Sequence, residues 1–169
     1  MTDDITYQIG WRLNDEKLIA DVAAFLRGIS PEDDEQANEN DRAAQLAIIA
    51  YAGQAVVAVS MLDIRLLDRV KQKFAFIRVA LGSGYEKDAT LSDEITQRTR
   101  DMIEAYAESH PEEGIFGMAA ILKKPGGGEL PVLPAGKLAL IGYTVRKEQV
   151  RVGWFGHVVV RPKQKNAYS

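Results

Sequence analysis

The spacing of apolar and polar residues along the chain predicts two helices. Apolar residues recur at helical intervals within residues 14–29 and again within residues 91–108, and each recurrence indicates a helix with one buried face. Asn14 or Asp15 would cap the first helix, and the pair His110 and Pro111 would end the second. The expected buried positions are Leu18, Ile19, Val22, Phe25, Leu26 and Ile29 in the first helix and Ile95, Thr99, Met102, Ile103 and Tyr106 in the second.

Runs dense in Val, Ile and Ala predict the strands. Residues 45–64 hold two such runs around Gly53, which is typical of a hairpin with a glycine turn. Further strands are expected at 6–13, 73–81 and 114–122, with a terminal hairpin at 138–160. The helix at 91–108 should belong to a right-handed crossover. This order predicts one α+β domain over residues 1–169, an α/β sandwich with a mixed, mostly antiparallel, twisted sheet flanked by helices and a flexible tail at 161–169.

Two polar segments separate these elements. Residues 123–137 are rich in Gly and Pro and predict a long loop. Residues 30–43 are acidic and predict an exposed loop, or alternatively an acidic rim that attracts a cationic substrate. The acidic residues are Glu32, Asp33, Asp34, Glu35, Glu39 and Asp41.

Composition narrows the class of protein. The 169 residues are 46% hydrophobic and 27% charged, which is ordinary for a globular domain with a core of its own. Cysteine is absent, which excludes disulfides, thiolate metal sites and a cysteine nucleophile. The net charge of −3 disfavours a nucleic-acid-binding role, and we expect no membrane association because no apolar run is long enough to cross a bilayer. The acidic N-terminus lacks a secretory pattern, so we expect a cytoplasmic protein.

A short polar loop joins the strand at 73–81 to the helix at 91–108. Such a junction is a common place to hold a phosphate, because the first N–H groups of a helix point outward together and the helix dipole favours an anion. The loop reads KDATLS over residues 87–92.

The order of elements and this loop resemble the GNAT superfamily of N-acetyltransferases, over residues 6–121. In that family the loop has the form Gln/Arg-x-x-Gly-x-Gly/Ala and binds the pyrophosphate of coenzyme A. Here Lys87 takes the place of the basic or amide residue, and Thr90 and Ser92 take the places of the two small residues. Thr and Ser are larger than Gly, but their hydroxyls can donate to phosphate oxygens.

The resemblance implies direct transfer of an acyl group from acetyl-coenzyme A, with no metal, to an amine of a small molecule or a protein. Family members splay the strand before the loop from the next strand, which leaves backbone groups free for the pantetheine arm. The implied cofactor-binding positions are Val79, Leu81, Lys87, Thr90, Leu91 and Ser92. Many members use a tyrosine on a later helix as the general acid. This chain has the Gly/Pro loop there, so Tyr143 is the nearest candidate along the chain.

Two alternatives stay open for the loop and the chemistry. Asp88 brings negative charge into the loop, and acidic residues in the first turn already satisfy the dipole, so Thr90 or Ser92 could simply cap an ordinary helix. The chain would then be a GNAT-like domain that has lost catalysis and serves as a binding or structural module. Tyr143 would in that case be an aromatic residue at the sheet edge, and Tyr85 is either a substrate contact or a surface residue.

The terminal hairpin also carries two adjacent aromatic residues, Trp154 and Phe155. Beside Arg151 they could stack on nucleic-acid bases, but a core-facing position fits the acidic chain better. If exposed, they would form the seam of a homodimer.

Overall fold

The computed structural model describes residues 4–29, 45–122 and 138–158, and within them the chain forms one mixed sheet with helices on both faces. The sheet order is β1-β2-β3-β4-β5-β7-β6. The strands are β1 Ile5–Ile9, β2 Leu46–Ala52, β3 Ala55–Leu67, β4 Gln72–Leu81, β5 Ile115–Leu122, β6 Ala139–Tyr143 and β7 Gln149–Trp154. The helices are α1 Glu16–Ile29, α3 Ala89–Ser109 and the short 3-10 helix η1 Pro111–Glu113. The predicted α+β fold is confirmed.

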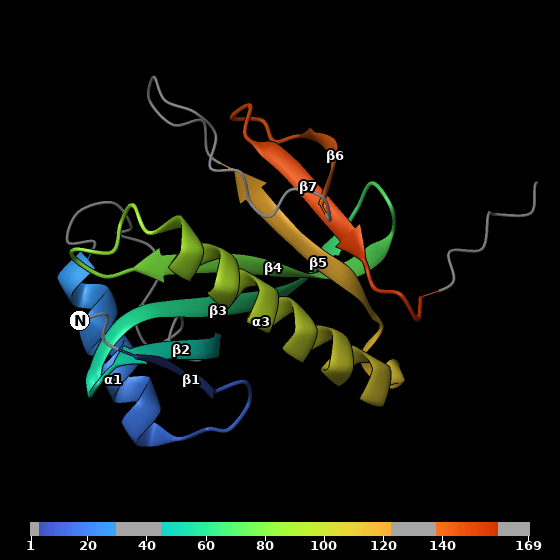
Figure 1. Ribbon diagram of the computed structural model, residues 1–169. Helices are drawn as coiled ribbons and strands as arrows, with labels where there is room; N and C mark the ends of the chain where they lie inside the picture. Colours follow the sequence, from blue (N-terminus) through green and yellow to red (C-terminus); the bar gives the residue numbers. More distant parts are fainter. Residues whose placement is uncertain (1–3, 30–44, 123–137, 159–169) are drawn as a thin grey trace, which may run out of the picture.

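Every described strand pair is antiparallel except β4 and β5, which are parallel and joined through α3. Figure 1 shows α3 lying across one face of the sheet and α1 on the other. The core agrees, because Val22 and Leu26 of α1 pack with Ile49 of β2, whereas Ile95 of α3 packs with the neighbouring Ile48. The two helices therefore cover opposite faces. The predicted acidic loop at 30–43, the Gly/Pro loop and the tail lie outside the described residues.

Most sequence-predicted boundaries hold. Asp15 caps α1, since its Oδ1 accepts the N–H groups of Lys17 and Leu18 at 2.9 and 3.3 Å. Gly53 sits in the β2–β3 turn at φ 62°, a conformation that glycine adopts without strain. The first strand is shorter than predicted, because it gives way at Gly10 to a turn closed by the Leu13 N–H. Within the described residues, no helix has the length and apolarity of a membrane span.

A buried polar cluster fastens α3 to the sheet. The register of β2 against β3 shifts between Leu46 and Ile48, and the displaced Ile48 N–H donates to Ser60 Oγ at 3.1 Å. Ser60 Oγ lies 2.6 Å from Thr99 Oγ1, which donates to the Ile95 carbonyl of α3 at 2.6 Å. Ser60 and Thr99 are fully buried, so these groups have no access to water.

We expect Ser60→Ala to lower the free energy of unfolding by about 1–3 kcal/mol, because it leaves the Ile48 N–H buried without an acceptor. Urea denaturation would measure the loss. Ser109→Ala is the matched control, since that hydroxyl bonds a carbonyl at the exposed end of α3 and its removal should change stability little. Equal effects of the two substitutions would contradict the structural role of Ser60.

Tyr7 of β1 packs against the outer side of α3. The Arg98 guanidinium lies 4.2 Å from the centre of its ring. Burial, followed by a hydrogen bond to the Glu94 carboxylate, raises the pKa of Tyr7 from 10.0 to about 12. The folded chain therefore favours the protonated phenol.

We expect this raised pKa to make stability fall at alkaline pH. The contribution of Tyr7 is complete below its unfolded-state pKa of 10.0 and is lost as the pH rises through about 12. Unfolding free energies measured by urea across that window should fall less steeply for Tyr7→Phe than for the unchanged chain. If the unfolding free energies of the two proteins fell equally steeply with pH, the pKa of Tyr7 would not be raised in the folded chain.

Candidate functional site

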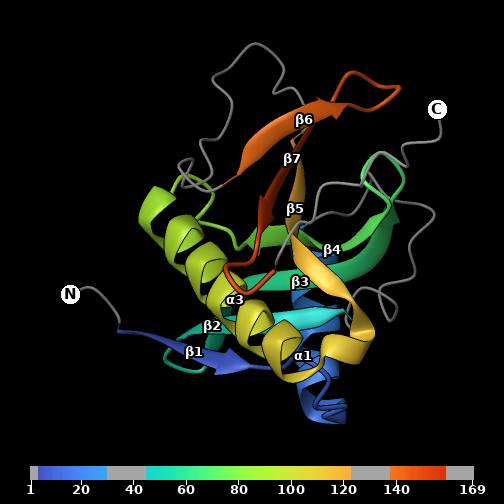
Figure 2. The same cartoon turned by 90° about the vertical axis from the view of Figure 1, so that its right-hand side faces the viewer.

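Strands β4 and β5 separate partway along their length. Their pairing joins residues 73–76 to residues 115–119 and then stops, although β4 continues to Leu81 and β5 to Leu122. Along its other edge, β5 pairs with β7 from Gly117 to Leu122. Figures 1 and 2 show β5, β7 and β6 turning away from β4 as a group. We call this divergence beyond Phe76 and Ala119 the splay.

The register on the other side of β4 shows which backbone groups face the splay. The Gly82 N–H donates to the Val57 carbonyl at 2.7 Å, so these two residues form a hydrogen-bonded pair of the antiparallel ladder. Alternation along β4 then directs the N–H and C=O groups of Ala80 toward β3, and those of Val79 and Leu81 toward the splay. Neither Val79 nor Leu81 has a strand partner there among the described residues.

Helix α3 begins beside the end of β4 and is capped by a carboxylate. Asp88 is the N-cap, and its Oδ1 accepts the Leu91 N–H at 2.9 Å. The cap is therefore Asp88, and the expectation that Thr90 or Ser92 caps this helix is wrong. Asp88 has φ −79° and ψ 89°, outside the helical region, so the helix can start only at the following residue, Ala89.

Most amides of this loop are already hydrogen-bonded. The Asp88, Ala89 and Ser92 N–H groups donate to backbone carbonyls. Among the described residues, the N–H groups of Lys87 and Thr90 have no such partner. The helix start therefore offers an anion two amides, the exposed Lys87 ammonium and two hydroxyl groups, but not the Leu91 N–H.

The side chains predicted for the cofactor site divide into two groups. Lys87 and Thr90 are exposed and Ser92 is half-buried, so these three lie together at the start of α3. The Leu91 side chain is buried and packs with Val57 and Ala58 against the sheet. Val79 and Leu81 lie on β4, with side chains packed on the α3 side of the core, so only their backbone groups are available to the splay.

Solved structures of other proteins share the fold of this chain. No family model matches the chain, and no curated protein matches it in sequence. An acetyltransferase of the GNAT family from Streptococcus pneumoniae superposes with a TM-score of 0.62 at 11% identity, over 90% of this chain and 100% of that one. The chain has the GNAT fold.

Two further GNAT-fold structures contain the cofactor. The protein yncA from Salmonella typhimurium, solved with its cofactor acetyl-CoA, has a TM-score of 0.58 at 10% identity over 95% of this chain and 99% of its own. A GNAT family acetyltransferase from Brucella melitensis in complex with acetyl-CoA has a TM-score of 0.50 at 10% identity over 94% of this chain and 93% of its own.

Tyr143 lies on the edge strand of this GNAT fold. It is opposite Gln149 of β7, which is in turn opposite Leu122 at the end of β5. Two strand spacings therefore separate Tyr143 from Leu122, or about 10 Å. Its side chain is 59% exposed. Tyr143 thus lies at the same end of the sheet as the open side of the splay, but not against β4.

The two aromatic residues of the terminal hairpin belong to the core. Phe155 is buried. Trp154 is half-buried, and its ring meets that of Phe74 edge to face with 5.8 Å between the ring centres. Its Nε1 donates to Gln72 Oε1 at 3.0 Å. The exposed aromatic pair on which the expected dimer seam depends is therefore not formed. The core-facing alternative is correct.

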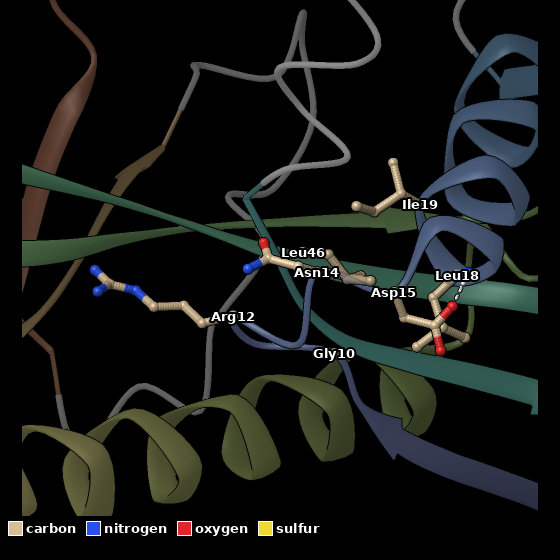
Figure 3. A pocket seen from close by; sticks show the side chains of 7 residues that line it. All are labelled: Gly10, Arg12, Asn14, Asp15, Leu18, Ile19 and Leu46. Carbon is tan, nitrogen blue, oxygen red and sulfur yellow. Dashed lines mark hydrogen bonds between the residues drawn. The ribbon is translucent and has the colours of Figure 1, made fainter.

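A small pocket lies at the start of α1, away from the splay. It is lined by Gly10, Arg12, Asn14, Asp15, Leu18, Ile19 and Leu46 (Figure 3). Its volume of about 40 Å³ has room for water rather than for a substrate. Arg12 extends away from it and pairs with Glu113 at 2.8 Å. The Tyr106 hydroxyl also donates to the Glu113 carboxylate, and this bond is the largest cause of the raised pKa of Tyr106.

Sequence reasoning missed Arg100. It lies on α3 next to the buried helix stripe, and its Nη1 is buried without a hydrogen-bond partner. The sequence did offer a signal. Arg100 lies four residues after Thr96 and three before Ile103, and both of these residues face the core, so helical spacing places Arg100 beside the buried face of α3.

Proposed function

We propose that this protein is an acyl-coenzyme A-dependent N-acyltransferase, with acetyl-coenzyme A as the acyl donor and an amine of a small molecule or a protein as the acceptor. The splay supports this most directly, because the backbone groups of Val79 and Leu81 face it without strand partners in the part of the chain that the structure describes. Structures with the same fold hold acetyl-CoA. Another structure with this fold, at a TM-score of 0.50, is the ribosomal-protein-S18-alanine N-acetyltransferase from Escherichia coli.

The described residues fit the arm of the coenzyme better than its diphosphate. The Val79 and Leu81 backbone groups would pair with the amides of the pantetheine arm, and a free N–H would polarise the thioester carbonyl. Lys87, Thr90 and Ser92 would hold the diphosphate without help from the Leu91 N–H. The bound thioester supplies the acyl group to the attacking amine, whose proton passes to a base or a water chain, and Tyr143 is the proposed proton donor to the departing thiolate.

A second function is a binding or structural module without catalysis. The acidic cap favours it, because the Asp88 carboxylate occupies one of the amides that would face the diphosphate. The Gly84 N–H is likewise taken by the Glu86 carboxylate at 2.8 Å. Two negative charges at the start of α3 would weaken binding of an anion.

Thermal denaturation with acetyl-coenzyme A separates the two functions. At a ligand concentration 100 times the dissociation constant, a ligand specific for the folded state adds about 2.7 kcal/mol. A chain of this size should then gain roughly 5–10 °C in midpoint. No shift at millimolar acetyl-coenzyme A would contradict the enzyme proposal. Release of free thiol on addition of a panel of amines would then test catalysis.

Reversal of the charge on Lys87 tests the diphosphate position. We expect Lys87→Glu to weaken binding of acetyl-coenzyme A by at least about tenfold in calorimetry, because a charge-assisted contact becomes a repulsion. Lys87 is exposed, so folding should be unchanged. Lys17→Glu, an exposed site on α1, is the matched control and should bind as the unchanged chain does. Equal affinities for the two variants would exclude Lys87 from the site.

A further inference from the structure

Arg100 lies on the flank of α3 that faces β5. Ile103 and Glu104, one turn further toward the C-terminus of α3, show which way this flank faces. Ile103 packs with Met118 and Ala120 of β5, and Glu104 Oε1 accepts the Gly156 N–H after β7 at 2.9 Å. The opposite flank faces β1, where Arg98 covers Tyr7. Because α3 runs antiparallel to β5, moving from Ile103 toward the N-terminus of α3 leads toward the splay.

One nitrogen of the Arg100 guanidinium, Nη1, is buried and unpaired among the described residues. One turn away on either side, Thr96 Oγ1 donates to the Ser92 carbonyl and Glu104 Oε1 accepts the Gly156 N–H, and neither oxygen accepts the Arg100 Nη1. An arginine does not lose its proton in a protein, so this is a permanent charge held partly out of water. Such a charge is costly unless an anion or a set of acceptors meets it.

The position of Arg100 excludes the diphosphate as that anion. It lies eleven residues after Ala89, the first residue of α3. At about 1.5 Å rise per residue this is roughly 16 Å along the helix. A diphosphate at the start of α3 would be beyond its reach, whereas the pantetheine arm would run along the splay toward it. Arg100 therefore flanks the reacting end of the proposed ligand.

We propose that Arg100 binds a carboxylate at the reacting end of the splay, carried either by the acyl group or by the amine acceptor. This inference rests on the proposed function. A planar guanidinium matches a carboxylate through two parallel N–H bonds, and the partly desolvated setting strengthens them. A plain acetyl group or a simple alkylamine would leave the charge unmet. The site would thus select a dicarboxylic acyl donor or an amino-acid acceptor.

Calorimetry with two ligand pairs tests this and distinguishes the two sources of the carboxylate. One pair is succinyl- against acetyl-coenzyme A, and the other is alanine against alaninamide with coenzyme A present. We expect the carboxylate-bearing member of one pair to bind at least tenfold more tightly, and Arg100→Met to abolish that preference while acetyl-coenzyme A still binds. Arg98→Met is the matched control, because Arg98 pairs with Glu94 at 2.9 Å on the other flank, and it should keep the preference.

Stability gives a second readout that a structural role would not reproduce. Removing an unpartnered, partly buried charge should leave the urea midpoint unchanged or raised, and Arg100→Lys should restore only part of the preference. Equal binding within both pairs, or a preference that survives in Arg100→Met, would overturn the role of Arg100 alone. Absence of acetyl-coenzyme A binding in the unchanged chain would instead overturn the proposed function.

Discussion

Val79→Pro is expected to abolish binding of acetyl-coenzyme A while the chain still folds. The Val79 N–H faces the splay and not β3, so proline removes no bond of the β3–β4 ladder. Its ring would occupy the space into which that N–H points, which removes the donor and blocks the approach of an amide from the ligand. We expect the affinity measured by calorimetry to fall by at least tenfold and unfolding stability to fall by less than about 2 kcal/mol.

The adjacent residue provides the control. The Ala80 N–H points toward β3 in the same register, so Ala80→Pro breaks the ladder and should cost on the order of 3 kcal/mol or prevent folding. This contrast between neighbours is a direct check of the register. If Val79→Pro bound acetyl-coenzyme A as tightly as the unchanged chain, the splay would not be the cofactor site.

Gly117→Ala is expected to produce a large loss of stability. A Cβ at this position of β5 would lie 2.2 Å from the Gly153 carbonyl oxygen of β7 and 2.9 Å from the Phe74 ring. The oxygen belongs to the backbone, so relief requires β5 and β7 to move apart. We expect a loss of about 3 kcal/mol or more, which corresponds to roughly 10 °C in the thermal midpoint.

A glycine in α1 serves as the comparison. Gly28 has open space around its Cβ position, so Gly28→Ala adds a better helix former without a clash. It should raise the stability by up to about 1 kcal/mol. In thermal denaturation, the midpoint should fall for Gly117→Ala and rise for Gly28→Ala. A stable Gly117→Ala protein would mean that β5 and β7 do not approach this closely.

Local pattern was sufficient for the elements with strong periodicity. The apolar stripe of α1, with Val22 and Leu26 at its centre, and the β2–β3 hairpin around Gly53 follow from spacing and turn chemistry alone. The same pattern does not show that β7, and not β6, lies beside β5, because both strands of a hairpin have a hydrogen-bonding edge to offer. That choice depends on packing, here of Phe74 with Trp154.

The site was harder to anticipate than the fold. Asp88, Thr90 and Ser92 are all residue types that cap helices, and only the backbone angles at Asp88 select among them. The separation of β4 from β5 was expected from the family resemblance and is present. The buried Arg100 Nη1, unpaired among the described residues, could not be anticipated, because its state depends on how the side chains around it pack and bond.

The brevity of the parallel ladder divides the sheet into two mechanical parts. One comprises β1 to β4 with α1, and the other comprises β5, β7 and β6. Among the described strands, residues 73–76 and 115–119 alone join the two parts edge to edge, while Ile103 of α3 packs across both. Amide hydrogen exchange should therefore reveal two cooperative units with different opening free energies. A ligand lying between them would act as a bridge and bring their exchange rates closer together.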